Sequence, residues 1–324
     1  MKLIVQIPCF NEEQTLAQVI ADIPREIQGI DLVELLVIDD GSADQTVRVA
    51  RENGVEHILI NKENLGLARS FQKGLYAALK MKADIIVNTD GDNQYAGADI
   101  AKLVQPIING EADIVVGDRQ TSKVAHFSKT KKMLQWLGSS LVRKLSGVSI
   151  PDAVSGFRAL SREAAIRINI ISSFSYTIEM LIQAGKRGMC VVSVPVGVND
   201  VTRESRLFQS IPQFLMRSMG TMVRVYSMYK PLRVFFLIGT FFTVVGFVPI
   251  VRFIYLYFSD DGAGHIQSLV LGGVFLLMGF VAYMIGLVTD LIASNRVLLE
   301  MTLERVKRLE LSESGKLDEE KVER

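Results

Sequence analysis

The sequence predicts an α/β domain with a mostly parallel sheet and flanking helices, followed by interfacial amphipathic helices and a two-helix transmembrane hairpin. Short apolar runs alternate with amphipathic stretches over residues 1 to about 200, and this alternation is typical of βαβ units. Beyond residue 231 come two long stretches without charged residues. The 324 residues of the chain leave room for about two structural units.

Each strand is predicted from a short run of apolar, largely β-branched residues. These runs are Leu3–Ile7, Leu35–Ile38, His57–Ile60, Ile85–Val87 and Ile114–Val116. Helices are predicted where apolar residues recur every three or four positions. Their ranges are Glu13–Ile23, Asp44–Glu52, Gly66–Met81 and Tyr176–Gly185. Asp44 is expected to cap the second helix, because its side chain can accept a bond from a free amide there.

Two segments in the last third predict a membrane anchor. Val234–Val251 and Ile266–Thr289 carry no charge, and each is close to the roughly 20 residues that a membrane-spanning helix needs. The stretch before them alternates apolar side chains with Arg206, Arg217 and Arg224, which is typical of helices in the membrane interface. Basic residues flank both spans, so the positive-inside rule places both termini in the cytoplasm.

These patterns divide the chain into six parts. They are a cytoplasmic domain (1–205), juxtamembrane amphipathic helices (206–231), a first transmembrane helix (232–258), an extracytoplasmic loop (259–265), a second transmembrane helix (266–293) and a charged cytoplasmic tail (294–324). The tail has a weak apolar stripe that includes Leu303, Val306 and Leu309. This stripe is expected to pack on the protein itself or on a partner chain, which permits a homo-oligomer.

Charge and cysteine content exclude several classes of protein. Lys and Arg total 36 against 35 Asp and Glu, a net charge of +1, which gives no electrostatic reason to expect nucleic-acid binding. The cysteines, Cys9 and Cys190, fit a reducing compartment and are too few for a four-cysteine zinc site. The run Leu3–Ile7 is too short for a secretory signal, so the N-terminal domain is expected to stay in the cytoplasm.

Acidic residues follow three of the predicted strands. Glu12 lies after the first, Asp39 directly follows the second, and Asp90-Gly91-Asp92 follows the strand at Ile85–Val87. Ligands of open parallel sheets bind at the carboxyl ends of the strands. Two carboxylates on a tight turn suit Mg²⁺ or Mn²⁺, which are often held by one or two carboxylates together with substrate phosphates. Neither a Gly-x-Gly-x-x-Gly nor a P-loop motif is present in the sequence.

Six short segments carry a resemblance to a known family. In chain order they are Pro8–Glu12, Asp39–Ser42, Asn64–Ala68, Asp90–Asp92, Gly117–Arg119 and Ser155–Arg158. Together they resemble the family 2 inverting glycosyltransferases with the A-type fold, whose nucleotide-binding part is Rossmann-like. With the hairpin, the chain resembles polyprenyl-phosphate glycosyltransferases of the dolichyl-phosphate mannose synthase type. The resemblance implies transfer of one sugar from a UDP- or GDP-linked donor to a polyprenyl phosphate in a membrane.

The resemblance also implies roles by position. For the nucleoside and donor these are Pro8, Phe10, Glu12, Asp39, Asp90 and Gly91, and for Mg²⁺ or Mn²⁺ they are Asp90, Asp92 and Gln94. Arg119 and Arg203 are implied at the phosphates or the lipid acceptor. Asp152 is implied beside the sugar and acceptor, either orienting the acceptor, stabilising the sugar or only capping a turn. Further candidates for the acceptor phosphate are Arg158, Lys129, Lys131, Lys132 and Arg206.

The sequence departs from the family in two places. Tyr95-Ala96-Gly97 stands where many relatives have His-Pro-Pro, and the segment 202–207 differs from the usual Arg-x-x-Gly-x-Ser-Lys. Both segments are implied near the sugar or acceptor, so the sequence does not name the donor sugar. The enzyme is expected in a prokaryotic plasma membrane rather than the endoplasmic reticulum.

Two alternatives remain at this point. One is a glycosyltransferase that acts on another lipid or on a polysaccharide. The other is an inactive, membrane-anchored protein that only binds a sugar nucleotide.

Overall fold

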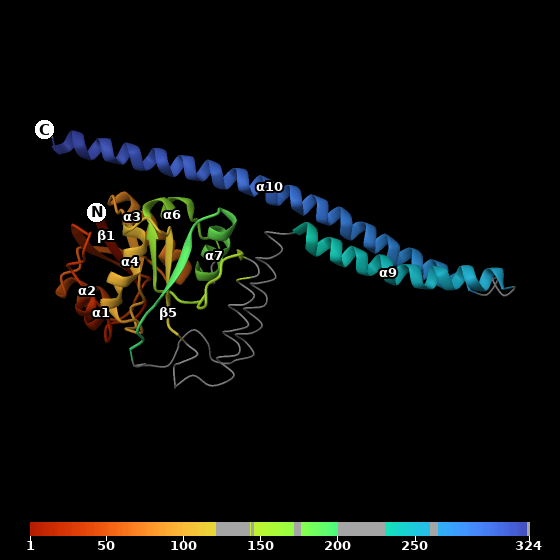
Figure 1. The fold of residues 1–324 in the computed structure, drawn as a ribbon, viewed down its shortest axis with the longest axis horizontal. Helices are drawn as coiled ribbons and strands as arrows, with labels where there is room; N and C mark the ends of the chain where they lie inside the picture. Colours follow the sequence, from red (N-terminus) through yellow and green to blue (C-terminus); the bar gives the residue numbers. More distant parts are fainter. Residues whose placement is uncertain (121–142, 144–145, 172–175, 200–230, 260–264, 323–324) are drawn as a thin grey trace. The chain divides into compact units, whose positions relative to one another are not determined.

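The computed structural model describes residues 1–120, 143, 146–171, 176–199, 231–259 and 265–322 (Figure 1). The chain forms two compact units. The first comprises Met1–Leu207 together with Glu304–Arg324, and the second comprises Phe208–Leu303. The juxtamembrane helices were predicted at 206–231. Of this range, the structure describes only residue 231, and the rest lies outside the described residues.

The first unit is built on a seven-stranded sheet in the order β3-β2-β1-β4-β6-β5-β7. β6 pairs antiparallel with both neighbours, and the other pairings are parallel. The predicted α/β fold with a mostly parallel sheet is therefore confirmed. The strands are β1 (Lys2–Cys9), β2 (Leu32–Asp39), β3 (His57–Ile60), β4 (Ile85–Asn88), β5 (Ile114–Asp118), β6 (Arg158–Ser161) and β7 (Val191–Pro195).

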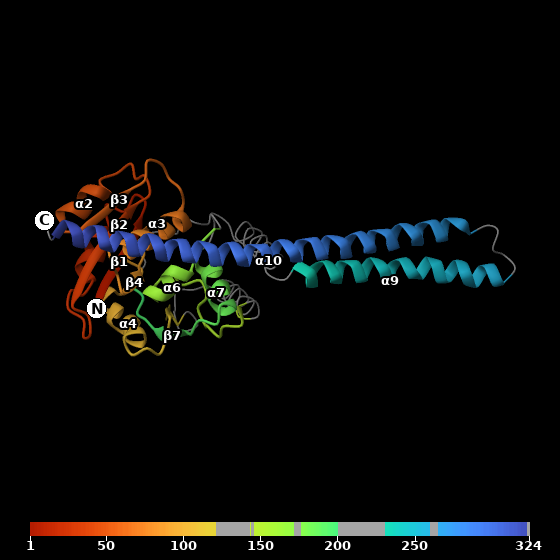
Figure 2. The ribbon, with the colours of Figure 1, turned by 90° about the horizontal axis from the view of Figure 1, so that it is seen from above.

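Helices cover both faces of this sheet (Figure 1, Figure 2). One face packs against α1 (Leu16–Asp22), α2 (Thr46–Glu52) and α4 (Ile100–Ile108), which share a buried cluster with alternate residues of β1. The other face carries α3 (Leu67–Lys80), α6 (Arg162–Arg167) and α7 (Tyr176–Lys186). A short 3-10 turn, η1 (Gly97–Asp99), precedes α4. With both faces covered, β1 is apolar along nearly its whole length, as expected of a buried parallel strand.

The second unit contains α9 (Pro231–Phe258) and the first part of α10 (Ile266–Val322). Both helices are long and apolar enough to cross a membrane, in line with the predicted hairpin. α10 continues as one helix through residue 293, where the sequence analysis placed the boundary between the second span and the tail. The second span and the tail therefore share a single helix.

Glycines bring the two helices into close contact. A Cβ on Gly246 would lie 3.0 Å from the Gly272 carbonyl oxygen, and one on Gly239 would lie 2.6 Å from the Tyr283 ring. Small residues at such crossings let helix backbones approach where no hydrophobic effect drives association. The Tyr283 hydroxyl lies 3.2 Å from the Thr240 hydroxyl, so a polar contact adds to the packing.

Gly279 provides a test of this packing. A Cβ there would lie 2.6 Å from the Thr243 hydroxyl and 3.0 Å from the Gly239 carbonyl oxygen, whereas a Cβ on Gly273 meets nothing within 4 Å. We expect Gly279→Val to destabilise the hairpin by about 1–3 kcal/mol, the usual cost of overpacking. Gly273→Val on the same helix is the matched control. Unfolding of the full-length protein in detergent measures both, and equal stabilities would contradict the close contact.

Candidate functional site

The loops after β1 and β2 are joined at one edge of the sheet. The Asp40 amide donates to the Cys9 carbonyl at 2.8 Å, and the Asn11 amide donates to the Ser42 hydroxyl at 2.9 Å. Asn11 takes a positive φ of 55°, a conformation that asparagine tolerates better than most residues. These bonds hold the first two loops side by side, as expected for the ends of adjacent parallel strands.

Asp39 and its neighbour Asp40 serve different purposes. Asp40 is saturated, because its carboxylate accepts from the amides of Leu65 and Gly66, each at 2.9 Å, and from the Asn61 side chain at 2.8 Å. Asp39 is only 2% exposed, and one of its oxygens, Oδ1, has no hydrogen-bond partner among the residues that the structure describes. A buried carboxylate oxygen without a donor calls for one from outside the protein, such as the N–H or hydroxyl of a ligand.

The turn Asp90-Gly91-Asp92 packs directly on the first loop. A Cβ on Gly91 would lie 2.9 Å from Cys9 Sγ and 3.2 Å from Glu12 Cγ, so this close approach requires glycine. The Thr15 hydroxyl bridges the two segments, since it lies 2.7 Å from the Gly91 carbonyl oxygen and 3.1 Å from Glu12 Oε2. The predicted convergence of Glu12 and the acidic turn is thus present in the structure.

The acidic groups at this edge repel one another. Burial and the charges of Asp92 and Glu12 together raise the pKa of Asp90 to about 7, against the opposing effect of Arg119. A hard divalent cation would relieve this repulsion, and carboxylate oxygens are its preferred ligands. The turn therefore fits Mg²⁺ or Mn²⁺. Among the residues described, no three His, Cys, Asp or Glu side chains gather to hold a metal, so such an ion would need further oxygens, as from a diphosphate.

Gln94 is the least defined of the predicted metal ligands. Its backbone amide donates to Asp92 Oδ1 at 3.1 Å, and its carbonyl accepts from the Asn199 amide at 3.0 Å. These bonds fix the backbone after the acidic turn. Coordination by the Gln94 side chain stays a prediction.

Tyr95 and Tyr176, neither of which was predicted to bind a ligand, form a wall beside Asp90. A Cβ on Gly156 would lie 2.9 Å from both Asp90 Oδ2 and the Tyr176 hydroxyl oxygen, so these groups surround Gly156. The Gly156 amide donates to the Tyr95 hydroxyl at 2.9 Å, and Asn88 Nδ2 donates to the Tyr176 hydroxyl at 3.0 Å. Buried aromatic residues look like core in a sequence, and only the position of Tyr95 just after Asp92 pointed to the site.

Asp152 and Arg119, both predicted site residues, form a bidentate ion pair. Arg119 Nε donates to Asp152 Oδ2 at 2.7 Å, and Arg119 Nη2 donates to Oδ1 at 3.1 Å. Asp152 is 1% exposed and Arg119 is 15% exposed. The carboxylate therefore anchors the guanidinium, a geometry in which two parallel bonds fix orientation as well as charge.

The prediction that Arg158 binds the acceptor phosphate is wrong. Arg158 is fully buried, and its guanidinium donates to the carbonyls of Ala153, Ser155 and Thr177, each at 2.8 Å. Burial lowers its pKa to about 10, which still leaves it protonated at neutral pH. Arg158 ties the turn after Asp152 to the first turn of α7, a structural role.

The other predicted residues fall into two groups. Pro8 is buried within β1, and Phe10 is 39% exposed at its end. Arg203, Lys129, Lys131, Lys132 and Arg206 lie outside the described residues. Burial and the surrounding carboxylates raise the pKa of the Cys9 thiol well above the usual value, which disfavours the thiolate form that a nucleophile requires.

Fold and site together define an α/β protein with an acidic, ligand-ready edge at the carboxyl ends of β1, β2 and β4. Residues 4–168 match the sequence pattern of Glycosyl transferase family 2. The chain belongs to this family.

Known proteins similar to this chain include two lipid-linked sugar transferases. The UDP-N-acetylglucosamine–dolichyl-phosphate N-acetylglucosaminyltransferase of Methanococcus voltae is 30% identical, with 59% of this chain and 82% of that protein covered. The undecaprenyl-phosphate mannosyltransferase of Micrococcus luteus is 26% identical, with 60% and 83% covered.

A solved structure with a similar fold is that of glucosyl-3-phosphoglycerate synthase from Mycobacterium tuberculosis with Mn²⁺ and UDP-glucose. The match has a TM-score of 0.52 and 24% identity, with 70% of this chain and 78% of that chain covered. At this level of identity the match shows a shared fold.

The raised pKa of Asp90 predicts a pH dependence for the metal-free protein. The pKa is about 7 in the folded state against an ordinary 3.8, so between these values the folded state binds more protons and stability falls as pH rises. Asp90→Asn removes this loss. We therefore expect the variant to be more stable than the wild type above about pH 7 and similar near about pH 4.

Thermal unfolding in the presence of a chelator measures this effect. The exposed Asp22→Asn is the control for loss of a carboxylate elsewhere. A wild-type stability that rises steadily from about pH 4 to about pH 8, in parallel with Asp90→Asn, would contradict the buried and crowded state of Asp90.

Proposed function

We propose that the protein transfers a single sugar from a UDP- or GDP-linked donor to a polyprenyl phosphate, with inversion and with a divalent metal. The observation that carries the proposal is the packing of Asp90-Gly91-Asp92 against the first loop, at the sheet edge where a buried Asp39 oxygen has no donor among the described residues. We assign the nucleoside to Asp39 and the metal-bound diphosphate to the acidic turn.

The acceptor class is inferred from two further facts. Two helices are long and apolar enough to cross a membrane, and similar proteins are named as transferases to dolichyl or undecaprenyl phosphate. A polyprenyl phosphate places its phosphate at the membrane surface while its chain stays in lipid. We accordingly infer a catalytic domain and both termini on the cytoplasmic side, with residues 259–265 outside.

The chain's own residues do electrostatic and positional work in this reaction. In this proposal Asp39 and Glu12 would hold the nucleoside, and Asp152 anchors the Arg119 guanidinium through two bonds. Asp92, with Asp90 and Gln94, would hold Mg²⁺ or Mn²⁺, which would supply positive charge for the leaving diphosphate. Attack by the acceptor oxygen from the face opposite the leaving group inverts the anomeric carbon.

The reaction needs no strong general base. The acceptor is a phosphate whose second pKa is about 6 by analogy with phosphate monoesters, so it is already anionic at neutral pH. The bonding of Asp152 agrees with a reaction that uses no general base, because both of its carboxylate oxygens accept bonds from Arg119. Its contribution is therefore to the placement and charge of Arg119, an effect of the preorganised kind.

The first test measures lipid-extractable radioactivity. Purified protein is mixed with polyprenyl phosphate, Mg²⁺ and a panel of labelled nucleotide-sugars, with a chelator as control and dephosphorylated lipid as a second acceptor. We expect metal-dependent transfer from one donor into the organic phase, with no transfer to the dephosphorylated lipid. Transfer to both lipids would point to another acceptor. If the protein is folded and transfers sugar from none of the donors, the proposal is contradicted.

Two substitutions separate the metal site from the ion pair. We expect Asp92→Ala to lower kcat by about 10³-fold or more, because the diphosphate loses its cation. Asp152→Ala leaves Arg119 present but unanchored, and we expect a smaller loss of about 10–100-fold. Steady-state kinetics with the identified donor measure both. An Asp92→Ala variant of full activity would remove the metal assignment.

A further inference from the structure

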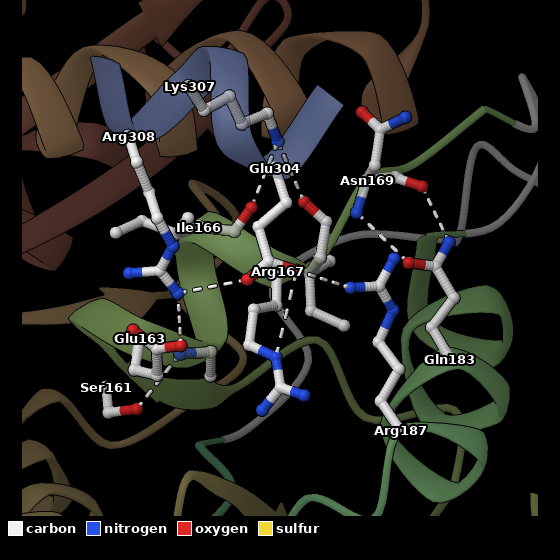
Figure 3. A network of polar contacts seen from close by, with 12 residues as sticks. Ser161, Glu163, Ile166, Arg167, Asn169, Gln183, Arg187, Glu304, Lys307 and Arg308 are labelled. Carbon is white, nitrogen blue, oxygen red and sulfur yellow. Dashed lines mark hydrogen bonds and ion pairs between the residues drawn. The ribbon is translucent and has the colours of Figure 1, made fainter. Parts of the chain in front are cut away.

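The C-terminal part of α10 belongs to the catalytic unit, where it contacts α6 and α7 (Figure 3). Glu304 accepts a bond from Arg187 Nη1 at 3.1 Å and one from Arg308 Nη2 at 3.0 Å, and it lies 4.0 Å from Arg167 Nε. Arg308 also bonds to Glu163 on α6. One carboxylate on α10 thus contacts Arg167 of α6 and Arg187, which directly follows α7.

Lys307 is the most deeply placed side chain of this segment, at 7% exposure. Its ammonium donates to the carbonyl oxygens of Ile168 at 3.1 Å and Ile166 at 3.4 Å, where α6 ends (Figure 3). Burial and the charge of Arg187 lower its pKa. A buried ammonium is costly unless it is hydrogen-bonded. These two bonds therefore stabilise the buried position of Lys307 and hold the backbone at the end of α6.

The backbone that Lys307 holds runs along α7 and is bonded to it. The Asn169 amide donates to Gln183 Oε1 at 3.0 Å, and Gln183 Nε2 donates back to the Asn169 carbonyl at 2.6 Å. The Ile171 amide lies 3.2 Å from Glu179 Oε2. Arg187 directly follows α7 and binds Glu304. α10 therefore holds α7 both through the segment 168–171 and at its C-terminal end.

The opposite end of α7 lies at the candidate active site. Tyr176, its first residue, accepts a bond from Asn88 at 3.0 Å and lies beside Gly156 and Asp90. The Thr177 carbonyl holds Arg158 at 2.8 Å. α7 has 11 residues, which span about 16 Å at 1.5 Å per residue. A tilt or slide of this helix at the α10 end would therefore be transmitted to the wall beside Asp90.

We propose that Lys307, with Glu304, is a positioning residue for sugar transfer: it fixes the segment 168–171 and α7, and α7 fixes Tyr176 against the acidic turn. This inference rests on the proposed function for its kinetic consequence. Its structural part, the control of α7 by α10, stands independently of the substrate.

The test uses the full-length protein in lipid nanodiscs and three variants. Lys307→Met keeps the length of the side chain and removes the ammonium, and Lys307→Arg restores a donor. Arg305→Met removes an exposed cation two residues away on the same helix and is the matched control. The readouts are kcat and KM for the donor, amide hydrogen exchange over 168–187, and the thermal midpoint.

We expect Lys307→Met to lower kcat about tenfold with a smaller change in KM, since misplacing a site by about 1 Å can cost up to about 10²-fold. Exchange in 168–171 and α7 should rise while that of β1 and β2 stays unchanged. Lys307→Arg should recover part of kcat and of the protection, and Arg305→Met should match the wild type.

Two results would overturn the inference. One is an unchanged exchange rate over 168–187 in Lys307→Met. The other is a lower thermal midpoint and faster exchange with kcat per folded molecule unchanged, which is what a purely structural role predicts. A wild type without transfer to any acceptor contradicts the proposed function instead, and the exchange comparison, which needs no substrate, still reports on the α10 contact.

Discussion

Repulsion between carboxylates at one edge of the sheet is the constraint on which this structure depends. Asp39, Asp90, Asp92 and Glu12 are brought together because β1, β2 and β4 are parallel and adjacent. A like charge raises the pKa of a buried carboxyl group, and the charges of Asp92 and Glu12 add to burial in raising the pKa of Asp90. Glycine at position 91 lets the turn approach the first loop, and the Thr15 hydroxyl bonds to both segments. A divalent cation would offset this concentration of negative charge.

Two arginines offset this negative charge in different ways. Arg119 lies close enough to lower the pKa of Asp90, but it is bound to Asp152 and so remains directed by that pair. Arg158 sits deeper, bonded to three carbonyls, and it too lowers the pKa of Asp90. Its charge acts through a medium of low polarity, where such effects extend further than in water. The same guanidinium thus joins two segments of backbone and moderates the field of the acidic turn.

The sequence was informative where one local pattern decides the outcome. The apolar runs of β1, β2 and β4 are long or pure enough to predict strands, and the acidic residues that follow them then share an edge by topology alone. β6 was missed, because Arg158–Ser161 is short and mixed in character, and it becomes a strand only between β4 and β5. Arg158 was misassigned for the same reason: the motif gives its position along the chain but not the side of the sheet on which its guanidinium is buried.

The end of α10 packs on the catalytic unit through charged side chains. The apolar stripe, predicted to pack on the protein or on a partner chain, is largely exposed in the single chain, with Leu309 at 64%, whereas Lys307 is buried. Exposed ion pairs such as Arg308 with Glu163 contribute little on their own. The buried ammonium differs, because its removal takes a donor away from the carbonyls of Ile166 and Ile168, and the loss of a buried hydrogen-bond partner is costly. A lysine that bonds to two defined carbonyls requires one geometry, whereas an apolar helix surface does not, so Lys307 gives this contact its specificity.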